Sequence, residues 1–280
     1  MSLIHQIAII IPTFNRVNET RNIILQLLSQ DFNQYKIIIC DSGSTDGTQN
    51  LESEFPDIAI LNVGADKWWT GAVNSGIKKV NCEGFELVLI LNDDLFIPEN
   101  LIKRLFEYSS LFPNTIITPV QQELSGQVYA GSIFKGKFKI RENIRKSPDK
   151  VLELDCSNGC CLFIPVKILN AIGITDENKI PHVGGDMSIY LRSRNLGFKC
   201  IVVPDLLIKH TSYTNYSNKF PISSILSHPG SVLHFKTYLY LGYFLYNSWI
   251  KFIIFGIKNH IVYIKTLIKT VINLTIAGKF

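Results

Sequence analysis

The sequence predicts an α/β fold in which a doubly wound, mostly parallel sheet is followed by a C-terminal amphipathic helical extension. Two observations predict the sheet. Short aliphatic runs, typical of strands, recur at residues 6–11, 36–40, 58–62 and 87–91, and segments with apolar residues at helical spacing separate them. Strands that alternate with helices in this way form parallel sheets with right-handed crossovers. A third observation predicts the extension: no acidic residue follows Asp205.

In the first half of the chain, each predicted strand is followed by a turn or loop that carries candidate site residues. Gln6–Ile11 leads to a turn at 12–16, 36–40 leads to Asp41, and 58–62 leads through a loop to Trp68 and Trp69. Helices are expected around 23–28, from Ser44 to Glu54, up to about Lys79, and from near Pro98. The run 87–91 is entirely aliphatic, which is typical of a strand buried on both faces of a sheet, and it ends in Asn92-Asp93-Asp94.

From Thr115 onward the predicted elements are shorter. Strands are expected at 116–119, 127–134 and 137–141, followed by a mobile polar loop at 142–150. A strand at 160–165 precedes a helix at 166–172, a second helix spans 187–196, and a last strand at 199–203 leads to His210. Asp186 lies directly before the second of these helices.

Acidic residues therefore follow two strands and open a later helix. Ligands of open α/β sheets bind at the carboxyl ends of the strands, where Asp41, Asp93 and Asp94 are expected. Mg²⁺ in such sites is held by one or two carboxylates together with phosphate oxygens. Two structural alternatives remain open: the Asp93-Asp94 pair could cap the helix near Pro98, and Asp186 could stabilise the positive end of its own helix.

The chain resembles the family 2 glycosyltransferases of the GT-A fold, which is Rossmann-like. The matching segments, which span about residues 5 to 212, are Ile11-Pro-Thr-Phe-Asn-Arg16, Ser29-Gln30, Asp41-Ser-Gly-Ser-Thr-Asp-Gly-Thr48, Gly71-Ala-Val-Asn-Ser-Gly-Ile77, Leu91-Asn-Asp-Asp94, Pro98-Glu-Asn-Leu101, Gly185-Asp186 and Leu191-Arg-Ser-Arg-Asn-Leu-Gly-Phe198. The resemblance implies an inverting glycosyltransferase of the bacterial rhamnosyltransferase-like or surface-polysaccharide type. It also implies Mg²⁺ or Mn²⁺ as cofactor and a UDP-, dTDP- or GDP-linked sugar as donor.

The resemblance also assigns roles to individual positions. The donor-binding residues would be Pro12, Thr13, Asp41, Ser42, Trp69, Asn74, Asn92 and Asp93. The metal ligands would be Asp93 or Asp94, with His210, and the catalytic base would be Asp186. The chain departs from the family in three places: Ser42 stands where a second Asp is frequent, Asn92-Asp93-Asp94 is not a full DxD motif, and Gly185 replaces the first acid of a Glu-Asp pair.

The charge of the chain is concentrated in its last part. The first 205 residues carry 20 basic and 23 acidic groups, whereas the remainder carries eight lysines and no acid, within a net charge of +5. We expect a catalytic domain at 1–212, with a nucleotide-sugar half to about 115 and an acceptor half from 116, and a helical tail at 213–280. The tail, with Lys251, Lys258, Lys265 and Lys269 beside apolar residues, predicts contact with an anionic membrane. The alternative is a pair of helices that pack on the catalytic domain or on a second subunit in a homodimer.

The resemblance and the basic, apolar tail favour a sugar or lipid-linked acceptor, and no nucleic-acid partner is expected. Six cysteines without a Cys-x-x-Cys pair, and an N-terminus without a basic leader, predict a cytoplasmic protein on the inner face of the cell membrane. Two other functions stay open. A nucleotidyltransferase would need a Gly-rich basic loop after the first strand, which 12–16 is not; the other is a catalytically inactive membrane-associated scaffold.

Overall fold

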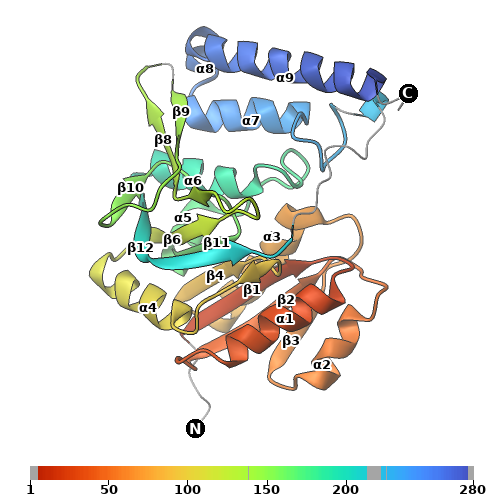
Figure 1. Ribbon diagram of the computed structural model, residues 1–280, viewed down its shortest axis with the longest axis vertical. Coiled ribbons are helices and arrows are strands. Elements are labelled where there is room, and N and C mark those ends of the chain that lie inside the picture. Colours follow the sequence, from red (N-terminus) through yellow and green to blue (C-terminus); the bar gives the residue numbers. More distant parts are fainter. Residues whose placement is uncertain (1–5, 138, 213–221, 225, 277–280) are drawn as a thin grey trace.

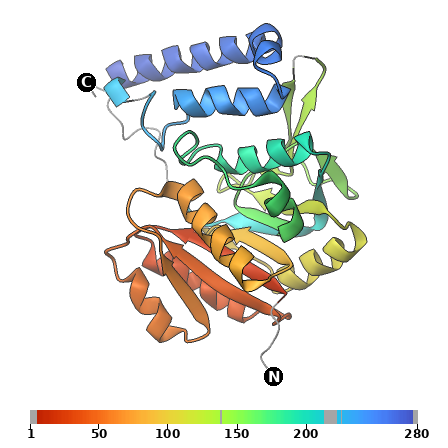
Figure 2. The ribbon, with the colours of Figure 1, turned by 180° about the vertical axis from the view of Figure 1, so that it is seen from behind.

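The computed structural model describes residues 6–137, 139–212, 222–224 and 226–276. It contains a central sheet between two layers of helices, with three further helices stacked on one side of the domain (Figures 1 and 2). The expected α/β fold with a helical C-terminal extension is confirmed. Lys219 and Lys279, which contribute to the expected basic tail, lie outside the described residues, and so does the side chain of Lys258.

The sheet runs in the order β10-β12-β6-β11-β4-β1-β2-β3. The strands of its first half are β1 (Ile7–Thr13), β2 (Tyr35–Asp41), β3 (Ile58–Asn62) and β4 (Leu87–Leu91), and they pair in parallel. Those of the second half are β6 (Thr115–Gln122), β10 (Leu152–Leu154), β11 (Cys161–Pro165) and β12 (Lys199–His210). Because β11 is antiparallel to both β4 and β6, and β12 is parallel to β6, the carboxyl ends of β1, β2, β4, β6 and β12 lie at one edge.

Alternate side chains of each buried strand pack against opposite helical layers. One layer is formed by α1 (Val17–Leu28), α2 (Leu51–Glu54) and α4 (Leu101–Leu111). The other is formed by α3 (Trp68–Glu83), α5 (Val166–Ile172) and α6 (Gly185–Asn195). In β1, for example, Ile9 packs in the first core and Ile10 in the second, which is the period-2 alternation of a doubly wound sheet.

Several expected boundaries are wrong. The helix expected from Ser44 begins only at a 3₁₀ turn (Thr48–Asn50), because Gly47 adopts a left-handed φ of 92° directly before it. The strand expected at 127–134 is divided into β7 (Val128–Tyr129) and β8 (Gly131–Lys135), and Gly131, the first residue of β8, has a φ of 131°. The polar segment expected to be a loop begins as a strand, β9 (Ile140–Ile144), which pairs with β8.

The strand that leads to His210 is also longer than expected. An irregularity between Val203 and Leu207 lets β12 continue along β6 as far as Lys209, and its end pairs with the short β5 (Leu95–Phe96). This extension brings His210 to the segment that follows the Asp93-Asp94 pair, because His210 is paired with Leu95.

The described part of the extension contains a 3₁₀ turn (Ile222–Ser224) and three helices, α7 (Phe235–Tyr246), α8 (Trp249–Phe255) and α9 (Ile257–Ile276). Helix α7 lies between α6 and α9 (Figure 1). Its last turn is tied to α6, because Asn195 Nδ2 donates to Phe244 O over 2.7 Å and Arg194 Nη2 donates to Leu245 O over 2.9 Å. Aromatic side chains join α7 to α9, with the rings of Tyr238 and Tyr263 stacked 4.1 Å apart.

Among the described helices, none is both long enough and apolar enough to cross a membrane.

Candidate active site

Thr13, Asp41, Asn92 and His210 all lie at the edge of the sheet where the parallel strands end. Thr13 is in register with Asp41, the last residue of β2, and the backbone N–H of Ser42 donates to Thr13 O over 3.0 Å. Short turns at this edge leave polar groups beside one another. The edge therefore assembles the residues that the sequence places after separate strands.

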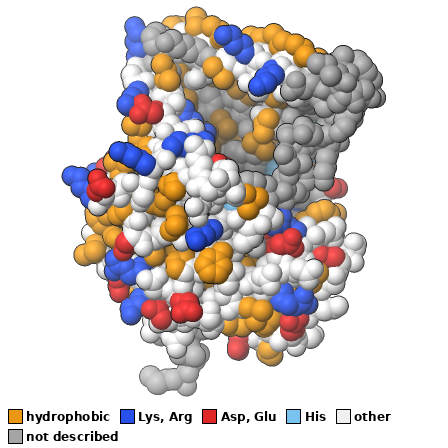
Figure 3. All heavy atoms as spheres, in the orientation of Figure 1, with side chains coloured by type: hydrophobic (Ala, Val, Ile, Leu, Met, Phe, Trp, Pro, Cys, Tyr) orange, Lys and Arg blue, Asp and Glu red, His pale blue; other side chains and the backbone are white. Residues whose placement is uncertain are grey.

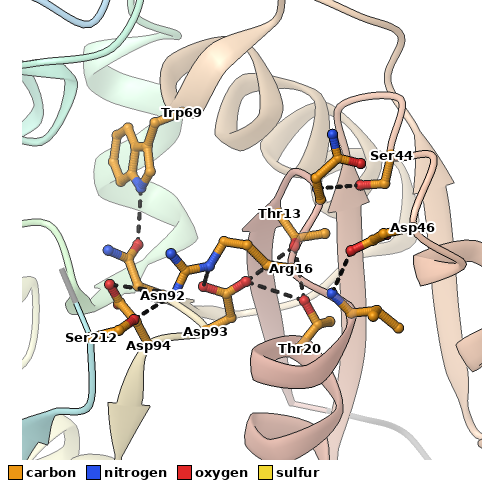
Figure 4. A network of polar contacts seen from close by, with 12 residues as sticks. Thr13, Arg16, Thr20, Ser44, Asp46, Trp69, Asn92, Asp93, Asp94 and Ser212 are labelled. Carbon is orange, nitrogen blue, oxygen red and sulfur yellow. Dashed lines mark hydrogen bonds and ion pairs between the residues drawn. The ribbon is translucent and has the colours of Figure 1, made fainter. Parts of the chain in front are cut away.

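Asp93 is the centre of a polar network at this edge (Figure 4). Its Oδ1 lies 2.9 Å from Arg16 Nε, and its Oδ2 lies 3.1 Å from the hydroxyls of both Thr13 and Thr20. Those two hydroxyls are 2.8 Å from each other. Only 6% of Asp93 is exposed. Both of its carboxylate oxygens are thus engaged by the protein itself, which suits a positioning role better than a ligand role.

Asp94 has a different environment. Its Oδ2 is 3.7 Å from Arg16 Nη2, whereas its buried Oδ1 has no hydrogen-bond partner among the described residues. A buried carboxylate oxygen without a partner is costly in a folded protein and indicates a position where a ligand or ion binds. The backbone of Asp94 is fixed as well, since Thr211 N donates to Asp94 O over 2.9 Å.

Burial raises the pKa of both carboxyl groups, and the charge of Arg16 opposes the shift. For Asp93 the resulting pKa is about 6. His210 also stabilises the ionised form of Asp94, and burial lowers the pKa of His210 although Asp94 opposes this. The pair is therefore a partly desolvated acidic site in which two carboxylates share the positive charge of Arg16, so an additional cation would stabilise their ionised forms.

Trp69 connects this site to the helix that carries Asp186. Its indole Nε1 donates to Asn92 Oδ1 over 3.0 Å, and its ring packs against Gly185. A Cβ at Gly185 would lie 2.3 Å from Thr70 Oγ1 and 2.9 Å from the Trp69 ring. The absence of the family's first acid at this position thus has a structural reason: Thr70 and Trp69 leave no space for a side chain there.

The Asp186 carboxylate is buried at the start of α6 and held by two backbone N–H groups. Gly159 N donates to Oδ2 and Met187 N to Oδ1, each over 2.7 Å. Burial raises the pKa of Asp186, while these two hydrogen bonds and the charge of Arg141 lower it. Asp186 is thus held in one orientation with its pKa above the ordinary value, as a general base requires.

Asp41 is fully buried and engaged at the turn after β2. Its Oδ1 accepts from Ser44 N over 3.0 Å and from the Ser44 hydroxyl over 2.5 Å, while Gln49 Nε2 lies 3.4 Å from Oδ2. Ser44 accepts in turn from Asn15 N over 2.8 Å, so this serine joins two loops and caps no helix. Contact of Asp41 with a nucleotide base or ribose stays a prediction.

Asn74 lies apart from the Asp93 network. Its Nδ2 donates to Thr175 O over 2.8 Å and to Glu177 Oε2 over 3.0 Å, and its Oδ1 accepts from Thr175 N over 3.2 Å. The side chain therefore fixes the segment at 175–177 against α3. A role in shaping the donor pocket stays a prediction, as does main-chain contact of Pro12 with the nucleotide.

Arg16 also belongs to this site, although no role is predicted for it from the sequence. It forms ion pairs with both Asp93 and Asp94, and its Nη2 donates to Ser212 Oγ over 3.2 Å. The only sequence signal was a basic residue in the turn after the first strand, which is the kind of turn that binds phosphate in other α/β proteins.

The donor set at Asp94 suits a divalent cation. The described residues contain no cluster of three or more His, Cys, Asp or Glu side chains arranged as a metal site. Mg²⁺ and Mn²⁺ do not need such a cluster when a diphosphate supplies the other oxygen ligands. The unpartnered Oδ1 of Asp94 and the imidazole of His210 would then be the protein's share of the coordination, and Asp93 would hold the segment in place.

A mixed sheet with acidic residues at the carboxyl ends of its strands, and a held carboxylate at a helix start beyond them, defines a glycosyltransferase of the GT-A fold. The family model described as "Glycosyl transferase family 2" matches residues 8–167. The chain belongs to this family.

Relatives of known sequence agree with this assignment. An uncharacterized glycosyltransferase of Rickettsia typhi is 27% identical over 181 residues, covering 61% of this chain and 54% of the relative. The O-antigen chain rhamnosyltransferase RfbN of Salmonella typhimurium is 27% identical over 105 residues, covering 38% of this chain and 33% of that protein. The chain thus spans about half the length of the Rickettsia typhi relative.

Solved structures share the fold. The structure of GalNAc-T7 with UDP, GalNAc and Mn²⁺ superposes with a TM-score of 0.60 at 13% identity, covering 75% of this chain and 44% of that one. Residues 1–349 of S. aureus TarS superpose with a TM-score of 0.59 at 15% identity, covering 86% of this chain and 70% of that one. The same TarS fragment with UDP-GlcNAc gives a TM-score of 0.55 at 16% identity, covering 86% and 71%.

Proposed function

We propose that this protein is an inverting, metal-dependent glycosyltransferase that moves a sugar from a nucleotide-diphosphate donor to an acceptor hydroxyl. The observation that carries the proposal is the unpartnered, buried Oδ1 of Asp94 beside His210 and Arg16. Structures of this fold that contain UDP, UDP-GlcNAc or UDP with Mn²⁺ support a nucleotide-sugar donor.

The donor would bind at the strand ends of residues 1–115. Pro12, Thr13, Asp41 and Ser42 would contact the nucleotide, and Asn74 would shape the pocket from behind. Trp69 would present its ring to the donor sugar, because its indole is oriented by the hydrogen bond to Asn92. Asp94 and His210 would hold Mg²⁺ or Mn²⁺, which neutralises the charge that develops on the diphosphate as the glycosidic bond breaks.

The acceptor would bind in residues 116–212, where Asp186 is the base. Its ionised carboxylate would take the proton of the acceptor hydroxyl as that oxygen attacks the anomeric carbon from the face opposite the diphosphate. Configuration at that carbon is inverted by this single displacement. The Gly159 and Met187 N–H groups hold Asp186 in place, so that the oxygen that receives the proton needs no reorientation.

A cell-surface polysaccharide or a glycolipid is the acceptor class that the extension favours. On α9, the exposed isoleucines 257, 261, 264, 268 and 272 fall within an arc of about 80° at 100° per residue. The exposed lysines 265 and 269 lie along one border of this arc. An isoleucine stripe with lysines at its border suits a helix lying in the interface of an anionic membrane.

The opposite face of α9 packs against another part of the extension. Tyr263 and Leu267 pack against buried Leu233, and the Tyr263 hydroxyl donates to Leu233 O over 2.7 Å. Residues 213–280 would therefore act as a peripheral anchor on the inner face of the cell membrane. The alternative occupant of the stripe is a second copy of the chain in a homodimer.

Thermal-shift titrations with UDP-, dTDP- and GDP-linked sugars, with and without Mn²⁺, test the proposal. We expect one donor to raise the melting temperature only when metal is present, and we expect Asp94→Asn to abolish this shift. Hydrolysis of that donor should be lost in Asp186→Asn, which should still bind it. Binding of every donor without metal would favour the inactive scaffold, and so would Asp94→Asn and Asp186→Asn variants that behave like the parent. Release of diphosphate from a nucleoside triphosphate would instead favour a nucleotidyltransferase.

A further inference from the structure

Arg141 is a basic residue of the β8–β9 hairpin that the proposed reaction does not use. Its Nε donates to Ser132 Oγ over 2.9 Å, and its Nη2 donates to the Tyr129 hydroxyl over 3.0 Å. These hydroxyls are 2.9 Å from each other, and Ser132 Oγ is also 2.7 Å from Asn143 Oδ1. One side of the guanidinium is thus fixed by the hairpin and the strand before it.

In the described part of the chain, Arg141 forms no ion pair with an acidic side chain. Nearby basic residues are different: Lys135 pairs with Glu142 over 2.6 Å and Arg194 pairs with Asp155 over 2.9 Å. A guanidinium carries five N–H donors, and the hydrogen bonds to Ser132 and Tyr129 use only two of them. Part of the Arg141 side chain is exposed, so the remaining donors can reach a ligand.

The position of Arg141 is close to the proposed base. Ser132, its hydrogen-bond partner, pairs with Cys156 through the backbone, and Gly159 three residues later donates to Asp186. Burial lowers the pKa of Arg141, but Cys156, Tyr129 and Asp186 raise it by more. The guanidinium and the Asp186 carboxylate therefore act on each other electrostatically on the acceptor side of the protein.

Figure 3 shows this side as a surface. The molecule is hollowed between the catalytic domain and the C-terminal helices, and basic side chains lie on the wall to the left of the hollow. In Figure 1 the β8–β9 hairpin rises on the same side, from the sheet toward α8. The hairpin and these basic side chains thus lie on the same side of the molecule.

We propose that Arg141 binds an anionic group, a phosphate ester or a carboxylate, on the acceptor. The proposal rests on the proposed function, in which Asp186 faces the acceptor hydroxyl. A planar guanidinium held from one side offers its free N–H groups as a fork, and a fork binds two oxygens of one oxyanion. The donor diphosphate is a less suitable occupant, because its place is at Asp94, where Arg16 already supplies a guanidinium.

Two small anions distinguish the sources of such a group. Phenyl phosphate represents a phosphate ester and glucuronate represents an acidic sugar. Each is titrated by calorimetry into the full chain whose donor site is filled with UDP and Mn²⁺, and into the chain alone. We expect one of them to bind the wild type, and Arg141→Gln to weaken that binding by at least about tenfold. Arg141→Lys should recover only part of it, since an ammonium has no planar fork.

Lys135→Gln is the matched control, because it removes one positive charge from the same hairpin and leaves Arg141 in place. It should bind the anion as the wild type does. Equal affinity in the wild type and Arg141→Gln, or no binding of either anion to wild type, overturns the proposal. Binding that is lost in Arg16→Gln but kept in Arg141→Gln also overturns it, since the anion then occupies the donor site.

Failure of the proposed function gives a separate result. If UDP and Mn²⁺ do not bind, the donor assignment fails, while the titrations into the chain alone still test the anion site. A circular-dichroism melting curve of Arg141→Gln within about 2 °C of the wild type confirms that the variant is folded. Phosphate-only binding assigns a phosphate-bearing acceptor, and glucuronate-only binding assigns an acidic sugar.

Discussion

Arg16 Nε lies 2.9 Å from Asp93 Oδ1, which places a guanidinium from the turn after β1 on the first carboxylate after β4. The same guanidinium reaches Asp94 at 3.7 Å. Asp93, which is itself held by the hydroxyls of Thr13 and Thr20, thus holds Arg16 where it reduces the repulsion between two adjacent acids. Arg16 supplies one positive charge for these two carboxylates before any ligand binds.

We predict that Arg16→Gln destabilises the protein by about 3–5 kcal/mol, because it leaves the buried Asp93 carboxylate without its counter-charge. Urea unfolding measures this change. Arg21→Gln is the control: Arg21 pairs with Glu54 on the surface, where ion pairs contribute little, and its unfolding midpoint should not move. Equal midpoints for both variants would contradict the structural role of Arg16.

The two neighbouring acids should give opposite phenotypes. Asp93→Asn breaks the contacts with Arg16, Thr13 and Thr20, so we expect a loss of about 3 kcal/mol in unfolding free energy. Asp94→Asn removes a carboxylate with an unpartnered oxygen, so stability should be kept or increased while the Mn²⁺-dependent thermal shift by the donor disappears. Urea unfolding and thermal shift in parallel measure both properties. A reversed pattern would assign the metal to Asp93.

The sequence predicted the fold because the buried strands have an unambiguous pattern. Five consecutive aliphatic residues in β4 are all buried, and Asn92 to Asp94 follow them at the edge where ligands bind. The helix expected from Ser44 failed for a local reason. The Ser44 hydroxyl is used by Asp41 and Asn15, and Gly47 then turns the chain before the helix starts. Patterns of apolar spacing carry no information about such side-chain contacts.

The sequence predicted which single positions belong to the site, but it did not predict which of these residues contact one another. Arg16 and Asp93 are far apart in the sequence, and no periodicity links them. The same is true of Trp69 and Gly185: only the packed structure shows that the indole occupies the space of a side chain at 185. The missing acid of the family's Glu-Asp pair is therefore explained by a residue that precedes it by more than a hundred positions.

Gly159→Ala should impair catalysis more than stability. A Cβ at this position would lie 2.4 Å from Asp186 Cβ, so the base or the loop must move, and the N–H that holds the carboxylate moves with it. We expect donor turnover to fall by about 100-fold. Gly71→Ala is the control, because its Cβ would meet only side-chain atoms of Lys67 at 3.1 Å and of Glu177 at 3.4 Å, away from Asp186. Near-normal turnover of Gly159→Ala would show that Asp186 is not positioned in this way.

His182 should make folding stability depend on pH. Burial, with a smaller effect of His228, lowers the pKa of His182 to about 4 from its ordinary 6.5, and its Nδ1 lies 3.4 Å from Trp69 N as an acceptor. The unfolded chain therefore binds the proton more readily than the folded one. The contribution of the neutral His182 side chain to the free energy of unfolding is about 3 kcal/mol. It is fully present above pH 6.5 and is lost as the pH falls toward 4.

The measurement for His182 is urea unfolding between pH 7 and pH 4. His182→Asn keeps an acceptor for Trp69 N but does not titrate in this range, so its unfolding free energy should decrease less steeply by about that amount. The pKa of His228 is lowered as well, by burial, but this side chain is less enclosed. His228→Asn should therefore change the slope less. Identical slopes for wild type and His182→Asn would contradict the assignment.

The isoleucine stripe of α9 should determine membrane binding. Ile264 and Ile268 lie near the middle of the stripe along the helix, and they are 52% and 54% exposed. Aspartates there place charge in the hydrocarbon boundary and leave the packed face at Tyr263 and Leu267 undisturbed. We expect Ile264→Asp/Ile268→Asp to reduce binding to vesicles containing phosphatidylserine by at least about tenfold, because apolar burial and lysine attraction are both lost. Co-sedimentation measures this at low and high salt.

Thr266→Asp is the matched control for charge. It lies between the two isoleucines in sequence but about 160° from Ile268 around the helix, and it is exposed, so one negative charge, half of that in the double variant, is added away from the stripe. We expect a modest loss of electrostatic attraction to the vesicles. This difference from the wild type should disappear at high salt, because exposed charges are then screened. If both variants bind vesicles as the wild type does, the anchor is refuted. If the double variant instead converts a dimer to a monomer in light scattering, the stripe is covered by a second copy of the chain.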